Sequence, residues 1–121
     1  MRRVIQKDED GCGVACVAML AGISYTQARL IMFGNEPVGL TSTSALIDVL
    51  VRLGRRPSKT QLSPLCGRDY RELKSDALLK VIRPGKWWFH WIVWDAKRER
   101  HLDPKQPAVK RPNVSSYLLF E

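Results

Sequence analysis

The sequence predicts a single α+β domain spanning residues 1–121, in which amino-terminal helices pack on a carboxy-terminal antiparallel sheet. Three observations favour this class. Apolar residues before Gly54 recur at helical spacing, the segments after Gly54 are short and broken by prolines and glycines, and two of those segments are strong strand candidates. A chain of 121 residues buries one core but is too short for a second independent unit.

The first two helices are marked by apolar runs and by their boundary residues. Apolar residues over 14–20 predict the first helix, with Gly22 near its carboxy-terminal end. Ser24 is a suitable N-cap for the second helix, which we expect to end at Gly34. The apolar face of that helix comprises Ala28, Leu30, Ile31 and Met32.

The third helix carries the clearest pattern. Thr41 or Ser42 can cap its amino terminus, and Gly54 closes it. Between them, apolar residues recur at helical spacing at Leu46, Ile47, Val49, Leu50 and Leu53.

Strands are expected at 78–82, 86–95, 100–102 and 116–120, with a turn at 97–100. In the second of these, residues alternate between two apolar faces, so we expect a central strand with neither face solvated. One face carries Trp88, His90, Ile92 and Trp94, and the other carries Trp87, Phe89, Trp91 and Val93. We expect the four tryptophans to be mainly core residues, although one of them can wall a cleft.

Charge and cysteine content restrict the partners and the compartment. The net charge of +8 attracts acidic partners, but the basic residues are spread over several segments, so nucleic acid is a possible but disfavoured partner. A helix-turn-helix over 24–53 is also disfavoured, because its connection at 34–39 is long and its helices carry few positive charges.

Three cysteines and the lack of a signal-peptide pattern predict reduced thiols and a cytoplasmic protein. The apolar run at 14–23 is short and follows three acidic residues. We therefore interpret it as a core helix, and we expect no transmembrane segment.

Cys12 is the first candidate for chemistry, because it lies between Gly11 and Gly13 at an expected helix start. Helix amino termini favour thiolate over thiol, and glycines allow close approach of backbone and substrate. The alternative is a small buried thiol. Cys16 falls one turn later among apolar residues and is expected in the core, and Cys66 is expected to be a loop thiol. A zinc site using these cysteines is disfavoured, because they lack paired C-x-x-C spacing.

His90, Asp103 and Gln6 complete a possible catalytic set. A histidine within an aromatic strand needs a partner or a role to offset its desolvation, and a satisfied core histidine is the alternative. Asp103 can orient an imidazole, or it can be a turn aspartate before a proline. Gln6 can donate to an oxyanion. His101 is expected at the surface, with a substitute role as base.

In this order the residues resemble those of the bacteriocin-processing, or double-glycine leader, peptidases, family 39 of the papain-like cysteine peptidases. Four segments carry the resemblance: Gln6-x-x-x-x-x-Cys12-Gly13-x-Ala15-Cys16-x-Ala18-Met19, the helix after Gly39-Leu40-Thr41, His90-Trp-Ile-Val-Trp, and Leu102-Asp103-Pro104. Gly11 stands where similar proteins usually have an acidic residue.

The resemblance implies a stand-alone papain-like domain without a cofactor or a metal. It implies that Cys12 is the nucleophile, His90 the general base, Asp103 its orienting residue and Gln6 the oxyanion donor. The expected activity is hydrolysis of a peptide or protein substrate, with small residues such as glycine favoured in a narrow cleft. An inactive relative that binds peptides or proteins is the alternative, and transfer to an amine or cleavage of a non-peptide amide uses the same chemistry. The oligomeric state is not predicted.

Overall fold

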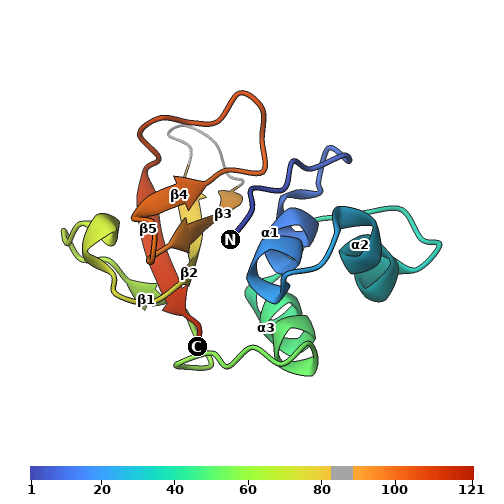
Figure 1. Ribbon diagram of the computed structural model, residues 1–121, viewed down its shortest axis with the longest axis horizontal. Coiled ribbons are helices and arrows are strands. Elements are labelled where there is room, and N and C mark those ends of the chain that lie inside the picture. Colours follow the sequence, from blue (N-terminus) through green and yellow to red (C-terminus); the bar gives the residue numbers. More distant parts are fainter. Residues whose placement is uncertain (83–88) are drawn as a thin grey trace.

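The computed structural model describes residues 1–82 and 89–121, and it confirms the α+β class. Figure 1 shows three helices on one side and an antiparallel sheet on the other. The helices are α1 (Cys12–Ala21), α2 (Tyr25–Phe33) and α3 (Thr43–Arg52). The strands are β1 (Ser63–Pro64), β2 (Ala77–Ile82), β3 (Phe89–Asp95), β4 (Arg100–Leu102) and β5 (Val114–Leu119), and a short 3-10 helix, η1, spans Tyr70–Glu72. The sheet order is β1-β5-β2-β3-β4.

The helix boundaries follow the capping residues. Ser24 caps α2 by accepting a hydrogen bond from the Gln27 N–H, and the Gln27 side chain accepts in return from the Ser24 N–H. Of the two candidates for α3, Ser42 is the cap. The first helix begins two residues earlier than the apolar run indicates, so that Cys12 is its first residue.

The strand predictions hold with shifted ends. The last strand begins at Val114 rather than at residue 116, and Phe120 instead forms an isolated bridge with Pro57. Residues 86–88 of the second expected strand, Trp87 and Trp88 included, lie outside the described residues. The sequence pattern did not indicate β1 or η1, which are too short to show a period.

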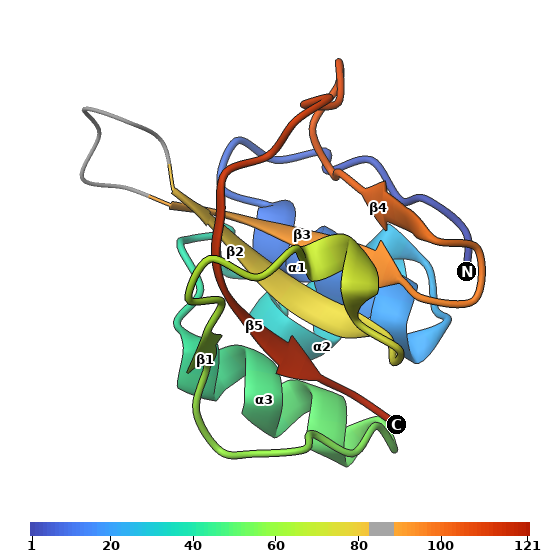
Figure 2. The ribbon, with the colours of Figure 1, turned by 90° about the vertical axis from the view of Figure 1, so that its left-hand side faces the viewer.

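Two apolar clusters sandwich the sheet. Trp91 and Val93 pack toward α1, whose residues from Cys12 to Leu20 are all buried. Ile92 and Trp94 face the opposite side, where the segment around η1 covers them. Figure 2 shows this segment in front of the sheet, with α1 behind it. The strand β3 is therefore buried on both faces, as its apolar alternation predicts.

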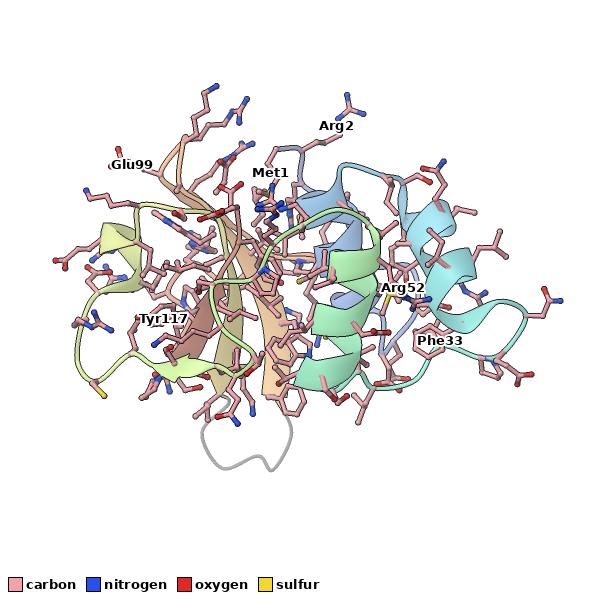
Figure 3. All side chains as sticks on the ribbon, turned by 90° about the horizontal axis from the view of Figure 1, so that it is seen from below. Met1, Arg2, Phe33, Arg52, Glu99 and Tyr117 are labelled. Carbon is pink, nitrogen blue, oxygen red and sulfur yellow. The ribbon has the colours of Figure 1, made fainter. Side chains whose placement is uncertain are left out.

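Residues of α3 belong to the same apolar core as α1 and the inner face of the sheet. Figure 3 shows α3 beside the strands. Tyr117 lies on the side of the sheet away from the helices. Leu46 and Leu50 of α3 are both fully buried in that core.

We expect Leu46→Ala to lower the free energy of unfolding by about 2–5 kcal/mol, because it removes buried methyl groups and leaves a cavity. Urea unfolding of the variant and the wild type measures the change. Leu30→Ala is the matched control, since Leu30 is 63% exposed and its truncation should change stability by less than about 0.5 kcal/mol. Equal losses in the two variants would contradict this assignment of the core.

Candidate active site

Helix α1 begins differently from the other two helices. Its N-cap is Gly11, and among the described residues no side chain caps it, whereas serines cap α2 and α3. A glycine at the N-cap in place of a serine costs only a few tenths of a kcal/mol of helix stability. It also leaves the N–H groups of the first turn, those of Cys12 and Gly13 included, available to an anion at the positive end of the helix dipole.

Both glycines that flank Cys12 touch other side chains. A β-carbon at Gly11 would overlap the Tyr25 hydroxyl, and one at Gly13 would overlap the Thr41 hydroxyl. Within the described chain, the groups that approach these glycines are protein hydroxyls, and the expected approach of a substrate stays a prediction. Glycine is thus required on both sides of Cys12 for packing.

His90 is held on β3 next to Asp103. β4 pairs with β3 only at Val93, Trp94 and Asp95, so no strand of the described chain neighbours His90 on that side. Asp103 directly follows β4, and its Oδ1 accepts a 2.7 Å hydrogen bond from Nε2 of His90. Both side chains are buried, with His90 4% and Asp103 2% exposed. The pair expected from sequence is therefore formed.

The backbone around Asp103 satisfies the rest of its carboxylate. The Lys105 N–H donates to Oδ1 and the Val109 N–H to Oδ2, each at 2.9 Å. The Arg3 guanidinium donates to the Asp103 carbonyl at 2.8 Å, and the Gln6 N–H donates to the Pro104 carbonyl at 2.8 Å. These bonds join the amino-terminal segment to the loop that carries the carboxylate.

Electrostatics favours a charged pair. Burial opposes the ionised form of Asp103, but the hydrogen bonds from His90, Val109 and Lys105 outweigh it and lower the pKa of this carboxyl. Burial likewise opposes the charged imidazole of His90. Its bonds to Asp103 and Cys12 outweigh that effect and raise the pKa of His90 to about 9. At neutral pH the imidazole is therefore protonated beside an ionised carboxylate.

Cys12 completes the site, because its side chain lines the same small cavity as His90 and helps to raise the pKa of the imidazole. Because Nε2 is bound to Asp103, Nδ1 is the ring nitrogen left for the thiol. An imidazolium between a thiol and a carboxylate can stabilise a thiolate nucleophile and can return the proton to a leaving group. The other buried thiol, Cys16, is suited to no such role, since burial, with Cys12 and Asp103 nearby, raises its pKa well above the usual value.

Gln6 lies at the same site, but its amide is turned toward the backbone. Its Nε2 donates to the carbonyls of Asp8 at 3.0 Å and Glu9 at 2.9 Å. Its Oε1 is buried, and no partner for it is found in the part of the chain that is described. In this arrangement both N–H groups of the amide are engaged, so donation to an oxyanion requires a turn of the side chain or help from the α1 backbone.

A small cavity of about 40 Å³ opens beside Cys12. Its lining residues are Gln6, Glu9, Asp10, Cys12, Leu40, Phe89, His90 and Lys105. Sequence reasoning did not name Leu40 or Phe89 as part of the site. Phe89 is next to His90 in the chain, and Leu40 is an apolar side chain that is 58% exposed, which only a structure reveals.

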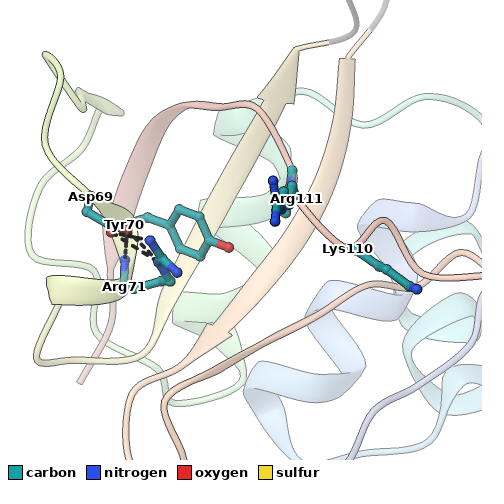
Figure 4. A pocket seen from close by; sticks show the side chains of 6 residues that line it. Asp69, Tyr70, Arg71, Lys110 and Arg111 are labelled. Carbon is teal, nitrogen blue, oxygen red and sulfur yellow. Dashed lines mark hydrogen bonds and ion pairs between the residues drawn. The ribbon is translucent and has the colours of Figure 1, made fainter.

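The remaining candidates lie elsewhere. His101 points to the other face of the sheet, where Nδ1 is 3.3 Å from the Tyr70 hydroxyl and Nε2 is 2.8 Å from the Val109 carbonyl, so it is not placed to act as a base for Cys12. Cys66 is exposed, as expected for a loop thiol. A larger hollow of about 430 Å³ is lined by Asp69, Tyr70, Arg71, Lys110, Arg111 and Pro112, and it contains neither Cys12 nor His90 (Figure 4).

Over residues 1–82 and 89–121, no group of three or more His, Cys, Asp or Glu side chains is arranged to hold a metal ion. Over the same residues, no single helix is long and apolar enough to cross a membrane; only α1 and α2 taken together pass that test, as a pair bent by 115°. Comparison with protein-family models and with curated proteins finds no match for this chain. The fold and site define an α+β domain with a buried Cys12–His90–Asp103 constellation.

The raised pKa of His90 predicts how stability depends on pH. The folded protein holds this proton up to about pH 9, whereas the unfolded chain releases it near 6.5. We therefore expect the free energy of unfolding to fall as the pH rises through that window. Urea unfolding across the window measures the slope. His90→Gln keeps a donor for Asp103 but does not titrate, so it should flatten the slope, and an unchanged slope would contradict the assignment.

Proposed function

We propose that this protein is a cysteine peptidase of papain-like type, related to the double-glycine leader peptidases that its sequence resembles. The observation that carries the proposal is the series Cys12, His90 and Asp103, in which His90 is hydrogen-bonded to Asp103 and lines one cavity with Cys12, at a helix whose first turn has no side-chain cap in the described chain. These three residues come from α1, β3 and the loop after β4, which are far apart in sequence.

The proposed reaction is acyl transfer to water. The Cys12 thiolate attacks the carbonyl carbon of a peptide bond, and the negative charge moves to the carbonyl oxygen. The imidazolium of His90 gives its proton to the leaving nitrogen as the carbon–nitrogen bond breaks, which leaves a thioester. His90 then takes a proton from water, which attacks the thioester and releases the acid and the thiolate. Asp103 fixes the ring so that Nδ1 faces the sulfur throughout.

The oxyanion is best stabilised by the backbone at the start of α1. The N–H groups of the first turn lie beside the attacking sulfur, and a side-chain cap would compete for them. The Gln6 amide adds a further donor if it turns away from the Asp8 and Glu9 carbonyls. The small cavity supports a substrate with glycine or another small residue next to the cleaved bond, because Leu40 and Phe89 narrow it.

A peptide-binding module on the same fold is the second candidate. It is favoured by one observation, the engagement of both Gln6 N–H groups by backbone carbonyls, which withholds the expected oxyanion donor. Such a module would use the cavity at Cys12 for recognition without cleavage.

Selective alkylation separates the two candidates. We expect iodoacetamide at mildly acidic pH to modify Cys12 faster than the exposed Cys66. We expect His90→Ala to slow the reaction by at least roughly tenfold, because it removes the cation that stabilises a thiolate at this site. Peptide mass spectrometry measures each site. Cys16 is an internal control, since its burial should protect it while the protein stays folded. Alkylation of Cys12 no faster than that of Cys66, or indifferent to His90, would favour the binding module.

A further inference from the structure

The loop that leads into the nucleophile, residues 6–11, is held by a residue of α2. Tyr25 is 4% exposed, and its hydroxyl donates a 2.6 Å hydrogen bond to Oδ2 of Asp8. The Tyr25 hydroxyl oxygen also accepts a hydrogen bond from the Asp8 N–H at 3.3 Å. One turn further along α2, the Arg29 guanidinium lies 3.6 Å from the same carboxylate oxygen. Helix α2 therefore binds both the side chain and the backbone of Asp8.

Hydrogen bonds to the Asp8 carbonyl restrain both ends of the loop, at Gln6 and at Gly11. This carbonyl accepts from the Gly11 N–H at 3.0 Å, and Gly11 is the N-cap of α1. It also accepts from Nε2 of Gln6 at 3.0 Å. The orientation of the Asp8 carbonyl therefore determines both the position of Gly11, directly before Cys12, and the orientation of the Gln6 side chain.

Tyr25 also contacts the Gly11 position directly. A β-carbon on Gly11 would overlap the Tyr25 hydroxyl, and its other contacts would be tight, at 3.0 Å from the Asp8 carbonyl oxygen and 3.2 Å from Cζ of Tyr25. The hydroxyl makes the most severe of these contacts. Burial and then the Asp8 bond raise the pKa of Tyr25 to about 12, so the phenol keeps its donor proton at any working pH.

We propose that the Tyr25 hydroxyl is a positioning group that fixes the 6–11 loop, and through it the first-turn N–H groups of α1 and the Gln6 amide, at the candidate active site. The link to catalysis rests on the proposed function. The fixing of the loop does not, because the bonds that carry it exist whether or not Cys12 reacts.

The first test is Tyr25→Phe, which removes the hydroxyl and keeps the ring. We expect the hydrogen-exchange protection of the Gly11 amide, measured by NMR, to fall roughly tenfold or more. This factor corresponds to the free energy of one hydrogen bond to a charged group. The rate of Cys12 alkylation should fall by a similar factor. Tyr117→Phe is the matched control, because it removes a hydroxyl that accepts from Arg68 at 2.8 Å on the far side of the sheet. It should change neither quantity.

The second test is a double-mutant cycle at Tyr25 and Gly11, which are in close contact. Gly11→Ala should strongly disturb the loop in the wild-type background and disturb it less in Tyr25→Phe, because the overlapping oxygen is gone. The same two readouts apply to all four members of the cycle, with thermal unfolding to show that each is folded.

The outcomes separate the two proposals. Unchanged Gly11 protection in Tyr25→Phe, or equal effects of Gly11→Ala in both backgrounds, would overturn the positioning role. If Cys12 of the wild type is reactive, lower Gly11 protection in Tyr25→Phe with an unchanged rate of Cys12 alkylation would overturn a role of Tyr25 in the reaction. An unreactive Cys12 in the wild type would instead count against the peptidase, while the exchange data still decide whether Tyr25 fixes the loop.

Discussion

An ionised carboxylate buried to 2% exposure is the constraint around which this structure is organised. Taking one partner from a buried ion pair typically costs 3–5 kcal/mol, so each oxygen of Asp103 must be satisfied. His90 and two backbone N–H groups satisfy them, and this requires the chain after β4 to fold back on itself. The same loop accepts hydrogen bonds from Arg3 and Gln6, which places the amino-terminal segment against it.

That arrangement adds a polar connection between the sheet and the helices to their apolar packing. His90 is hydrogen-bonded to Asp103 and lies beside Cys12, so its ring connects the beginning of β3 to the beginning of α1. Helix α1 is buried along nearly its whole length, with α2 and α3 on one side and β3 on the other. A helix packed in this way has little freedom to slide, and the position of its first residue is therefore fixed by the core.

Much of the fold could be read from the sequence, because its signals are local. Ser24 and Ser42 mark helix starts because their side chains cap the first turn. The apolar residues on both faces around Trp91 indicate a strand that is buried on both sides. Cys12, His90 and Asp103 could be named because their types suit one chemistry, and the structure brings them together. The turn of the Gln6 amide could not be foreseen, since it depends on where the Asp8 and Glu9 carbonyls point. The contact between Tyr25 and Gly11 was equally hidden, because an aromatic residue at a helix start signals only packing.

Helix α1 has no side-chain cap among the described residues, and the contact between Tyr25 and Gly11 gives a physical reason for this. A serine at position 11 would suit the helix, as serines do at α2 and α3, yet its side chain would take the space that the Tyr25 hydroxyl fills and would occupy first-turn N–H groups. Glycine leaves the helix start less stable and more open to an anion. Tyr25 and Asp8 then restore the order that a cap would have provided, from outside the helix and without competing for its donors. A neighbouring helix thus holds the residue before Cys12, while no side chain of the described residues caps the first turn of α1.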